Sequence, residues 1–323
     1  MQCIDVSLQE NDKTQPENRG RPKVLPIFLG ILFIFAFAGG FINGYSLGSH
    51  SSHKNGDAAS IYLNFPPAAS AESAASQNGD DYEPVMQAVL SNNEYIVYDA
   101  LVDSVIRVVP QSSFTMPSAT TVSMERIIEI TKIVQNNPEF FWVEAMTWIT
   151  WTDNADTTRT YTVNISYNID AQTKSLTQKQ IEAVVAPILA SASCRNASEA
   201  AAYVNEYLAS QVTYMDDEAH QTEYPYDAIS GPLLTQQAIC SGYAKTFSYL
   251  MARLGYSSAY CLGYTKEGVF HAWNAIKDGD KILYTDPTFN ASGSFRNDNW
   301  LNLPRESFTD HQETQKFWYE PIA

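Results

Sequence analysis

The spacing of apolar residues divides the chain from about residue 82 onward into helices and strands. Helical spacing predicts helices over 83–91, 93–108 and 178–192, and over two capped runs that begin after Ser123 and after Asn196 or Ser198. Alternation with aromatic and β-branched residues predicts strands over 140–151 and 159–169. Helices and strands are thus mixed, as in an N-terminal α+β extension that precedes a second domain.

An uncharged apolar run, LPIFLGILFIFAFAGGFI, covers residues 25–42. It has roughly the length that spans a bilayer as a helix. Arg19, Arg21 and Lys23 precede it, so the positive-inside rule places the N-terminus in the cytoplasm. We predict an uncleaved signal anchor; the alternative is a signal peptide that is cut after Ala38. The globular part is then extracytoplasmic, and either anchored in the membrane or secreted.

Composition separates this run from the folded part. The following residues are rich in Ser, Ala, Gly and Asn, which predicts a flexible linker. The expected organisation is a cytoplasmic N-terminus (1–24), a membrane segment (25–48), a linker (49–81), the N-terminal extension (82–195) and a catalytic domain (196–323).

The charge balance excludes one class of partner. The chain has 20 Lys and Arg against 36 Asp and Glu, and a formal net charge of −16. Such a surface repels phosphate backbones, so nucleic acid is not an expected partner. The four cysteines form no C-x-x-C pair and are too few for a disulfide scaffold. A bridge between Cys194 and Cys261 stays open.

Cys240 stands where a loop becomes a helix. From Ala244 onward an apolar stripe follows helical spacing, and Gly255 is a plausible C-terminal cap. The unpaired N–H groups and the dipole at a helix N-terminus stabilise an anion, so a thiol there can act as a nucleophile. A buried cysteine is also often a small apolar core residue. The segment alone leaves both interpretations open.

A nucleophilic thiol needs a base, and the base needs an orienting group. His271 lies in an alternating run, VFHAWNAI (269–276), and a second run, KILYTDPTF (281–289), follows an Asp-Gly turn. If Lys277 pairs with Asp280, His271 faces Asp286 directly across the hairpin. A structural His–Asp pair and a zinc site with Cys240 are the alternatives.

These residues together resemble the transglutaminase-like superfamily, specifically its bacterial domains. The resemblance is carried by AICSGYAKTFSYLMARLG (238–255), HAWNAI (271–276) and YTDPTF (284–289). It implies an α+β, papain-like core in which a nucleophile helix packs on an antiparallel sheet. Cys240 is then the nucleophile, His271 the base and later acid, and Asp286 the orienting group, with no cofactor or metal. Oxyanion donors are open among the N–H of Cys240, Gln237 and Tyr226.

The expected function is acyl transfer through a cysteine thioester, which means a peptidase, an amidase or an acyltransferase. Its substrate would be a protein or peptide, with the cell envelope as one source. The alternative is a non-catalytic surface module on the same fold, which binds peptides or assembles envelope complexes. The tail after residue 291 is expected to form coil and a short strand, and His311 in it is interpreted as structural.

Overall fold

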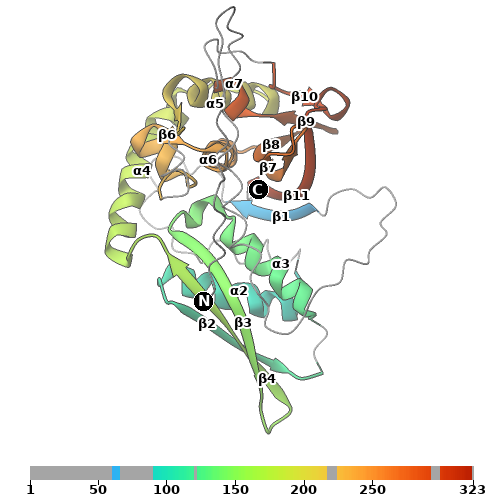
Figure 1. Ribbon diagram of the computed structural model, residues 1–323. Helices are drawn as coiled ribbons and strands as arrows, with labels where there is room; N and C mark the ends of the chain where they lie inside the picture. Colours follow the sequence, from blue (N-terminus) through green and yellow to red (C-terminus); the bar gives the residue numbers. More distant parts are fainter. Residues whose placement is uncertain (1–59, 66–89, 120–121, 217–223, 292–298, 322–323) are drawn as a thin grey trace, which may run out of the picture.

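A computed structural model describes residues 60–65, 90–119, 122–216, 224–291 and 299–321 (Figure 1). No helix in these segments is both long enough and apolar enough to cross a membrane. The predicted membrane segment at 25–48 and nearly all of the predicted helix at 83–91 lie outside the described residues. The signal anchor therefore stays a prediction.

The larger sheet has six strands in the order β1-β11-β7-β8-β9-β10. Its strands are β1 (Ser60–Phe65), β7 (Ser258–Thr265), β8 (Phe270–Asp278), β9 (Lys281–Thr285), β10 (Leu303–Pro304) and β11 (His311–Pro321). All neighbours are antiparallel except β1, which pairs with β11 in parallel. β1 lies within the segment that was expected to be a linker.

Helices cover one face of this sheet. α6 (Cys240–Arg253) packs on β7, β8 and β11, and α4 (Ala171–Ser191) and α5 (Ala197–Gln211) pack on α6 (Figure 1). Strand residues such as Ala272 and Ile276 join the main core on this side. The opposite face has its own apolar cluster, which includes Trp273, Phe308 and Trp318. The sheet is therefore buried on both faces.

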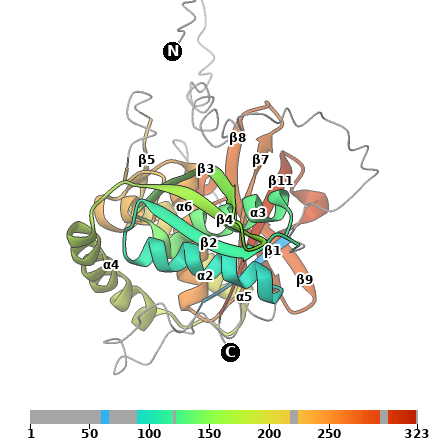
Figure 2. The ribbon, with the colours of Figure 1, turned by 90° about the horizontal axis from the view of Figure 1, so that it is seen from below.

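A smaller sheet, in the order β2-β4-β3, is built from the N-terminal part of the chain. It comprises β2 (Gln111–Pro117), β3 (Val143–Asp153) and β4 (Thr158–Tyr167). α2 (Asn92–Ile106) and α3 (Met124–Gln135) pack against it (Figure 2). Ser123 caps α3 by accepting a hydrogen bond from the Arg126 N–H at 3.2 Å. The mixed α+β composition predicted for this part is confirmed, whereas β2 was not predicted.

Short elements complete the fold. They are the 3₁₀ turns η3 (Pro138–Phe140) and η5 (Arg305–Ser307), the π turn η4 (Gly231–Thr235), the two-residue strands β5 (Thr213–Tyr214) and β6 (Gln237–Ala238), and α7 (Pro287–Ala291). β5 pairs with β6 in parallel just before α6 begins.

The predicted register of the β8–β9 hairpin is wrong. Asp278 pairs with Lys281, so the loop is Gly279-Asp280, with Gly279 at a φ of 61°. Glycine at the first loop position is the preference of a type II′ turn, which matches the twist of the strands. The shift is two residues relative to the expected pairing. Because side chains alternate with a period of two, an even shift keeps His271 and Asp286 on the same face.

The predicted structure of the tail is incomplete. A short strand is present as β10, but residues 311–321 also form the long strand β11, which lies between β1 and β7. Its residues Phe317, Trp318 and Tyr319 are all buried. Consecutive buried residues show no alternation, so the pattern that reveals a half-exposed strand is missing here.

Candidate active site

Cys240 is the first residue of α6 and is 5% exposed. The first N–H groups of a helix have no acceptor inside it, so this end of α6 presents donors beside the sulfur. Gly242 lets the preceding loop approach closely, because a Cβ there would lie 2.3 Å from the Tyr226 carbonyl oxygen. The helix start is thus held against the loop that leads into it.

Asn274 fixes α6 to the sheet. Its buried amide nitrogen lies 2.9 Å from the Ala244 carbonyl oxygen and 3.0 Å from the Ser248 hydroxyl, both on α6. It also lies 3.0 Å from the Ala259 carbonyl oxygen on β7. A buried polar group with several partners specifies one geometry. The helix that carries Cys240 therefore has a defined position relative to β8, three residues from His271.

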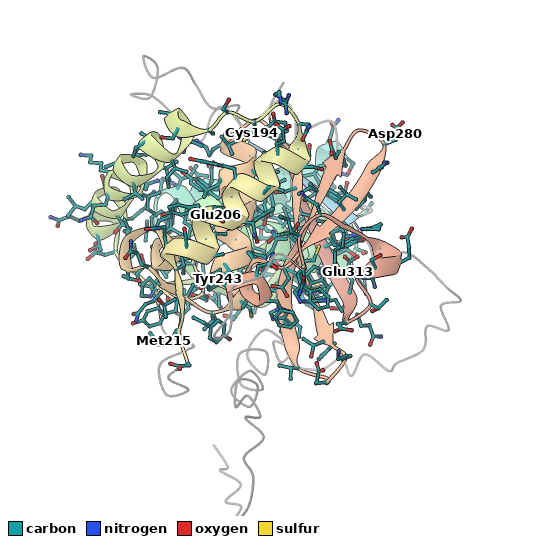
Figure 3. All side chains as sticks on the ribbon, turned by 90° about the horizontal axis from the view of Figure 1, so that it is seen from above. Cys194, Glu206, Met215, Tyr243, Asp280 and Glu313 are labelled. Atoms are coloured by element: carbon teal, nitrogen blue, oxygen red, sulfur yellow. The ribbon has the colours of Figure 1, made fainter. Side chains whose placement is uncertain are left out.

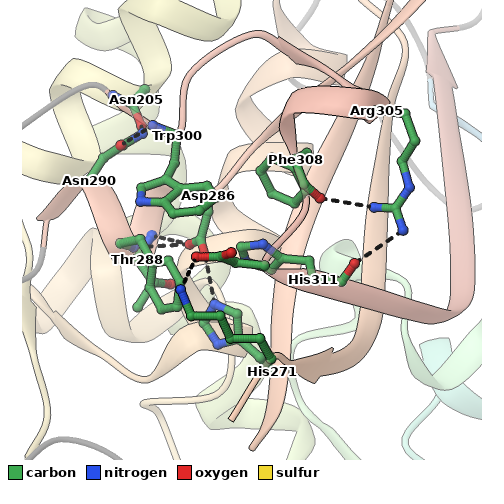
Figure 4. A network of polar contacts seen from close by, with 12 residues as sticks. Asn205, His271, Asp286, Thr288, Asn290, Trp300, Arg305, Phe308 and His311 are labelled. Carbon is green, nitrogen blue, oxygen red and sulfur yellow. Dashed lines mark hydrogen bonds and ion pairs between the residues drawn. The ribbon is translucent and has the colours of Figure 1, made fainter. Parts of the chain in front are cut away.

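The structure brings His271 and Asp286 together. His271 Nε2 lies 2.7 Å from Asp286 Oδ2, and the side chains are 1% and 0% exposed (Figure 4). The other carboxylate oxygen, Oδ1, accepts hydrogen bonds from the N–H groups of Thr288 at 2.9 Å and Phe289 at 3.0 Å. Asp286 thus lies at the start of α7 with its carboxylate orientation fixed.

Electrostatics keep this pair charged. Burial lowers the pKa of His271, but attraction to Asp286, its hydrogen bond to Asp286 and an interaction with Cys240 outweigh this and raise the pKa to about 10. Burial raises the pKa of Asp286, yet attraction to and hydrogen bonds from His271 and His311 leave it well below its usual range. At neutral pH the pair is an imidazolium next to a carboxylate.

The other ring nitrogen of His271 is available for chemistry. Nδ1 is buried and has no hydrogen-bond partner of regular geometry among the described residues. Cys240 is nevertheless close enough to contribute to the raised pKa of the ring. Catalytic hydrogen bonds are often long in an unliganded site and shorten with substrate. Nε2 is thus held by Asp286, while the ring also interacts with the cysteine.

Sequence reasoning missed His311. Its Nε2 lies 2.9 Å from the same Asp286 Oδ2, and its side chain is fully buried. The two imidazoles therefore share one carboxylate oxygen (Figure 4). His311 comes from the start of β11, which was not predicted, so no local signal could place it. The nearby run of aromatic residues, FWYEP, was the only hint of a buried strand.

Aromatic rings enclose the two histidines. His271 stacks on Phe289 at a centroid distance of 4.8 Å, and His311 stacks on Phe308 at 4.1 Å. Trp273 and Trp300 meet His311 edge to face at 4.8 Å and 5.3 Å. This apolar surrounding strengthens the electrostatic interactions inside it.

The other candidate residues make no hydrogen bond with this group in the described part of the chain. Gln237 is exposed in β6, and Tyr226 is half-buried in the preceding loop, where its carbonyl accepts the Ile239 N–H. Neither side chain is hydrogen-bonded to His271 or His311. Cys194, Cys240 and Cys261 are free thiols, so a Cys194–Cys261 bridge is absent from the structure. Cys261 interacts with Glu313, and Figure 3 shows Glu313 on a different part of the molecule from Cys194.

One metal-binding possibility comes from the same residues. His271, Asp286 and His311 each offer a ligand atom, and these atoms lie within 4.8 Å of one another. No other such group occurs in the described part of the chain. The Nε2–Oδ2 separations of 2.7 and 2.9 Å are hydrogen-bond lengths, and a direct imidazole–carboxylate contact accounts for them.

Comparison with known proteins identifies a family for part of the chain. Residues 182–300 match the model of the transglutaminase-like superfamily. No curated protein sequence matches the chain significantly. The resemblance drawn from the sequence motifs is confirmed, and so is a transglutaminase-like core within a mixed α and β fold.

Several solved structures are similar over part of their length. A TGase crystal structure is 14% identical, with a TM-score of 0.32, and covers 58% of this chain. Legionella pneumophila LapG in a calcium-bound form is 11% identical, with a TM-score of 0.34, and covers 45% of this chain and 82% of its own. A candidate cysteine protease from Cytophaga hutchinsonii is 8% identical, with a TM-score of 0.31, and covers 64% of this chain and 70% of its own. The chain spans 53% of the TGase. Similarities this weak and this partial do not identify the activity of the chain.

Proposed function

We propose that this chain, whose residues 182–300 belong to the transglutaminase-like superfamily, is a cysteine enzyme that cleaves or exchanges amide bonds through a thioester. Cys240 is the nucleophile, His271 the acid and base, and Asp286 the group that orients the imidazole. The observation that carries the proposal is the buried contact of 2.7 Å between His271 and Asp286. The same imidazole also interacts with Cys240.

The proposed reaction begins with the Cys240 thiolate, which attacks the carbonyl carbon of an amide and forms a C–S bond. The C–N bond breaks as His271 gives a proton to the leaving amine. Nδ1 is the nitrogen that can do this, because Nε2 is hydrogen-bonded to Asp286. Water or a second amine then attacks the thioester and returns a proton to His271, and Cys240 leaves as the thiolate. Water gives hydrolysis, and a lysine amine gives a crosslink.

The start of α6 supports stabilisation of the oxyanion that forms during this attack. The backbone N–H of Cys240 belongs to the set that a helix leaves without internal acceptors. Donors of this kind stabilise developing negative charge next to the nucleophile. Gln237 precedes the sulfur by three residues and is exposed, so it is the second donor that we propose.

The proposed substrate is a protein or peptide, and the proposed location is outside the cytoplasmic membrane. The support for the location is the uncharged run at 25–42 with three basic residues before it. The support for the substrate is the chemistry, since an amide carbonyl is the natural partner of a thiol with a neighbouring acid and base.

Trapping the acyl-enzyme tests this function. The purified chain is incubated with a peptide library, quenched in acid, and examined by intact-mass and peptide mass spectrometry. We expect an adduct on Cys240 that hydroxylamine removes, as it does a thioester. Cys240→Ala should form no adduct and retain its fold, whereas Cys194→Ala should form it as the native chain does.

A second measurement tests the nucleophile without a substrate. Burial raises the pKa of the thiols of Cys194 and Cys261, so both should react slowly near neutral pH. We expect iodoacetamide at about pH 6.5 to modify Cys240 first, as read by peptide mapping. If Cys240 reacts no faster than Cys261 and no adduct forms with any peptide, the chain is a binding module on this fold and not an enzyme.

A further inference from the structure

His311 lies against the proposed catalytic group without touching the reacting atoms. Its Nε2 lies 2.9 Å from Asp286 Oδ2, the oxygen that also contacts His271. We propose that His311 is a positioning residue, which donates a hydrogen bond to Asp286 and so fixes the carboxylate that orients His271. This role rests on the proposed function, but the contact itself can be tested without any activity.

The hydrogen-bond inventory of Asp286 supports this role. The carboxylate is buried and charged, and an ionised carboxylate can only accept hydrogen bonds. Both imidazoles must therefore carry a proton on Nε2. Oδ2 accepts from the two rings, and Oδ1 accepts from the N–H groups of Thr288 and Phe289. With all of these bonds made, the carboxylate has one orientation.

The protein holds His311 in place from several sides. Arg305 donates hydrogen bonds to the carbonyl oxygens of His311 at 3.1 Å and Phe308 at 3.4 Å (Figure 4). The ring of His311 stacks on Phe308. Its Nδ1 is buried without a hydrogen-bond partner among the described residues. Nε2 is therefore the ring nitrogen that the structure places in a hydrogen bond, the one to Asp286.

Loss of the His311 hydrogen bond should act through Asp286. Oδ2 would keep one donor where it now has two, and a buried charged oxygen that loses a donor turns toward any other polar group within reach. His271 would then lose its fixed orientation. Proton transfer depends on that orientation, whereas substrate binding does not involve His311.

Kinetics of two variants test this effect. His311→Phe keeps the aromatic stacking and removes the donor, and His311→Gln keeps a donor close to the position of Nε2. We expect His311→Phe to lower kcat by about tenfold to a hundredfold with little change in KM. His311→Gln should recover part of the loss. Phe308→Leu is the comparison: it weakens the packing against His311 but leaves the donor, so it should lower the Tm and lower kcat less than His311→Phe does.

Nuclear magnetic resonance of the native chain tests the contact even if no substrate is found. With ¹⁵N-labelled histidine, we expect His311 to carry a proton on Nε2, the nitrogen that contacts Asp286. The ring N–H signals of both histidines should lie far downfield, as for bonds to a carboxylate. His311→Phe should remove one signal and shift the other, while His311→Gln should remove one and leave the other nearly in place.

Three results would overturn the proposal. One is a proton on Nδ1 instead of Nε2 of His311. Another is a His271 signal that does not move in His311→Phe. The third is stoichiometric binding of zinc that both His311→Phe and Asp286→Asn abolish, since the group would then be a metal site. Failure of the proposed function would look different: no adduct on Cys240, with both ring N–H signals present.

Discussion

At the scale of single residues, the charge on Asp286 controls the state of His271. Burial alone would make the imidazole neutral, and attraction to the carboxylate reverses this. The raised pKa of His271 contributes to the stability of the folded state. This contribution is fully present below about pH 6.5, the pKa of the group in the unfolded chain, and is lost as the pH rises through about 10. The lowered pKa of Asp286 contributes stability above about pH 3.9, the pKa of the group in the unfolded chain, and this stability is lost as the pH falls. The pair is therefore most stabilising between these limits.

The Asp286→Asn variant should separate the orientation of the Asp286 side chain from the effect of its negative charge. The amide oxygen can still accept from Thr288 and Phe289, but the attraction to the imidazolium is gone. The pKa of His271 should fall from about 10 to below about 6.5, and turnover should fall by about two to four orders of magnitude. Histidine titration by nuclear magnetic resonance and the pH–rate profile measure these effects.

Asp310→Asn is the matched control for that variant. Asp310 forms a surface ion pair with Lys266 at 2.6 Å and precedes His311 by one residue. It carries the same change of charge away from the buried carboxylate, so turnover and the His271 titration should be unaffected. Native turnover in Asp286→Asn would remove Asp286 from the catalytic group.

At the scale of elements, the two histidines depend on the contact between β7 and its neighbours. Gly263 in β7 lies opposite His271 of β8 and opposite Glu313 of β11. A Cβ at Gly263 would lie 2.0 Å from the Gln312 carbonyl oxygen and 2.7 Å from the Trp273 ring. Only glycine fits at this point. The spacing of β8 and β11 therefore depends on the absence of a side chain at Gly263. The position of both imidazoles depends on that spacing.

Gly263→Ala should therefore disturb the site through the backbone. A methyl group there must displace β11 or Trp273, so we expect a loss of about 2–4 kcal/mol in unfolding free energy. Gly268→Ala is the control, since Gly268 has a φ of 78° but nothing within 4 Å of its Cβ position. It should cost about 1 kcal/mol through backbone strain alone. Urea denaturation measures both, and equal losses would contradict the packing argument.

At the scale of the whole molecule, one polar cluster ties the N-terminal part of the fold to the helix of Cys240. Arg253, at the end of α6, makes two parallel hydrogen bonds to Glu182 of α4, at 2.6 and 2.9 Å. Tyr249 donates to Glu182 at 3.0 Å. Glu139 of η3 interacts with both Arg253 and Glu182. Burial raises the pKa of Glu139 to about 7; Arg253 opposes this shift and Glu182 adds to it.

Glu139→Gln should reveal this coupling as a pH effect. A raised carboxyl pKa contributes stability below about 4.3, its unfolded value, and loses it as pH rises through about 7. The side chain keeps some exposure, so we discount the full effect and expect the Gln variant to be more stable than the native chain by about 1–2 kcal/mol at about pH 8. At about pH 4, below the unfolded value, the two should be nearly equal.

Urea denaturation at the two pH values measures the difference. Glu182→Gln is the comparison, because it removes one half of the ion pair with Arg253 and should destabilise at both pH values. A stability difference between Glu139→Gln and the native chain that does not change with pH would show that Glu139 is not the titrating group.

Local signals in the sequence determined which residues of the site come together. The helical stripe after Ala244 placed Cys240 at the start of α6, and the alternation around His271 predicted β8. The pairing of His271 with Asp286 survived a wrong register, because a shift of two residues preserves the face of a strand. The assignment of catalytic roles to these residues and the membrane segment stay predictions.

Only the tertiary structure decided that a second imidazole shares Asp286. His311 reaches the site because β11 pairs with β7, nearly fifty residues earlier in the chain. Local patterns reveal a strand when one face is exposed to water, whereas β7 is buried on both faces along most of its length, and β11 is buried on both faces in its second half. Long-range burial, which no short window of sequence records, therefore decided the order of the sheet and the surroundings of the carboxylate.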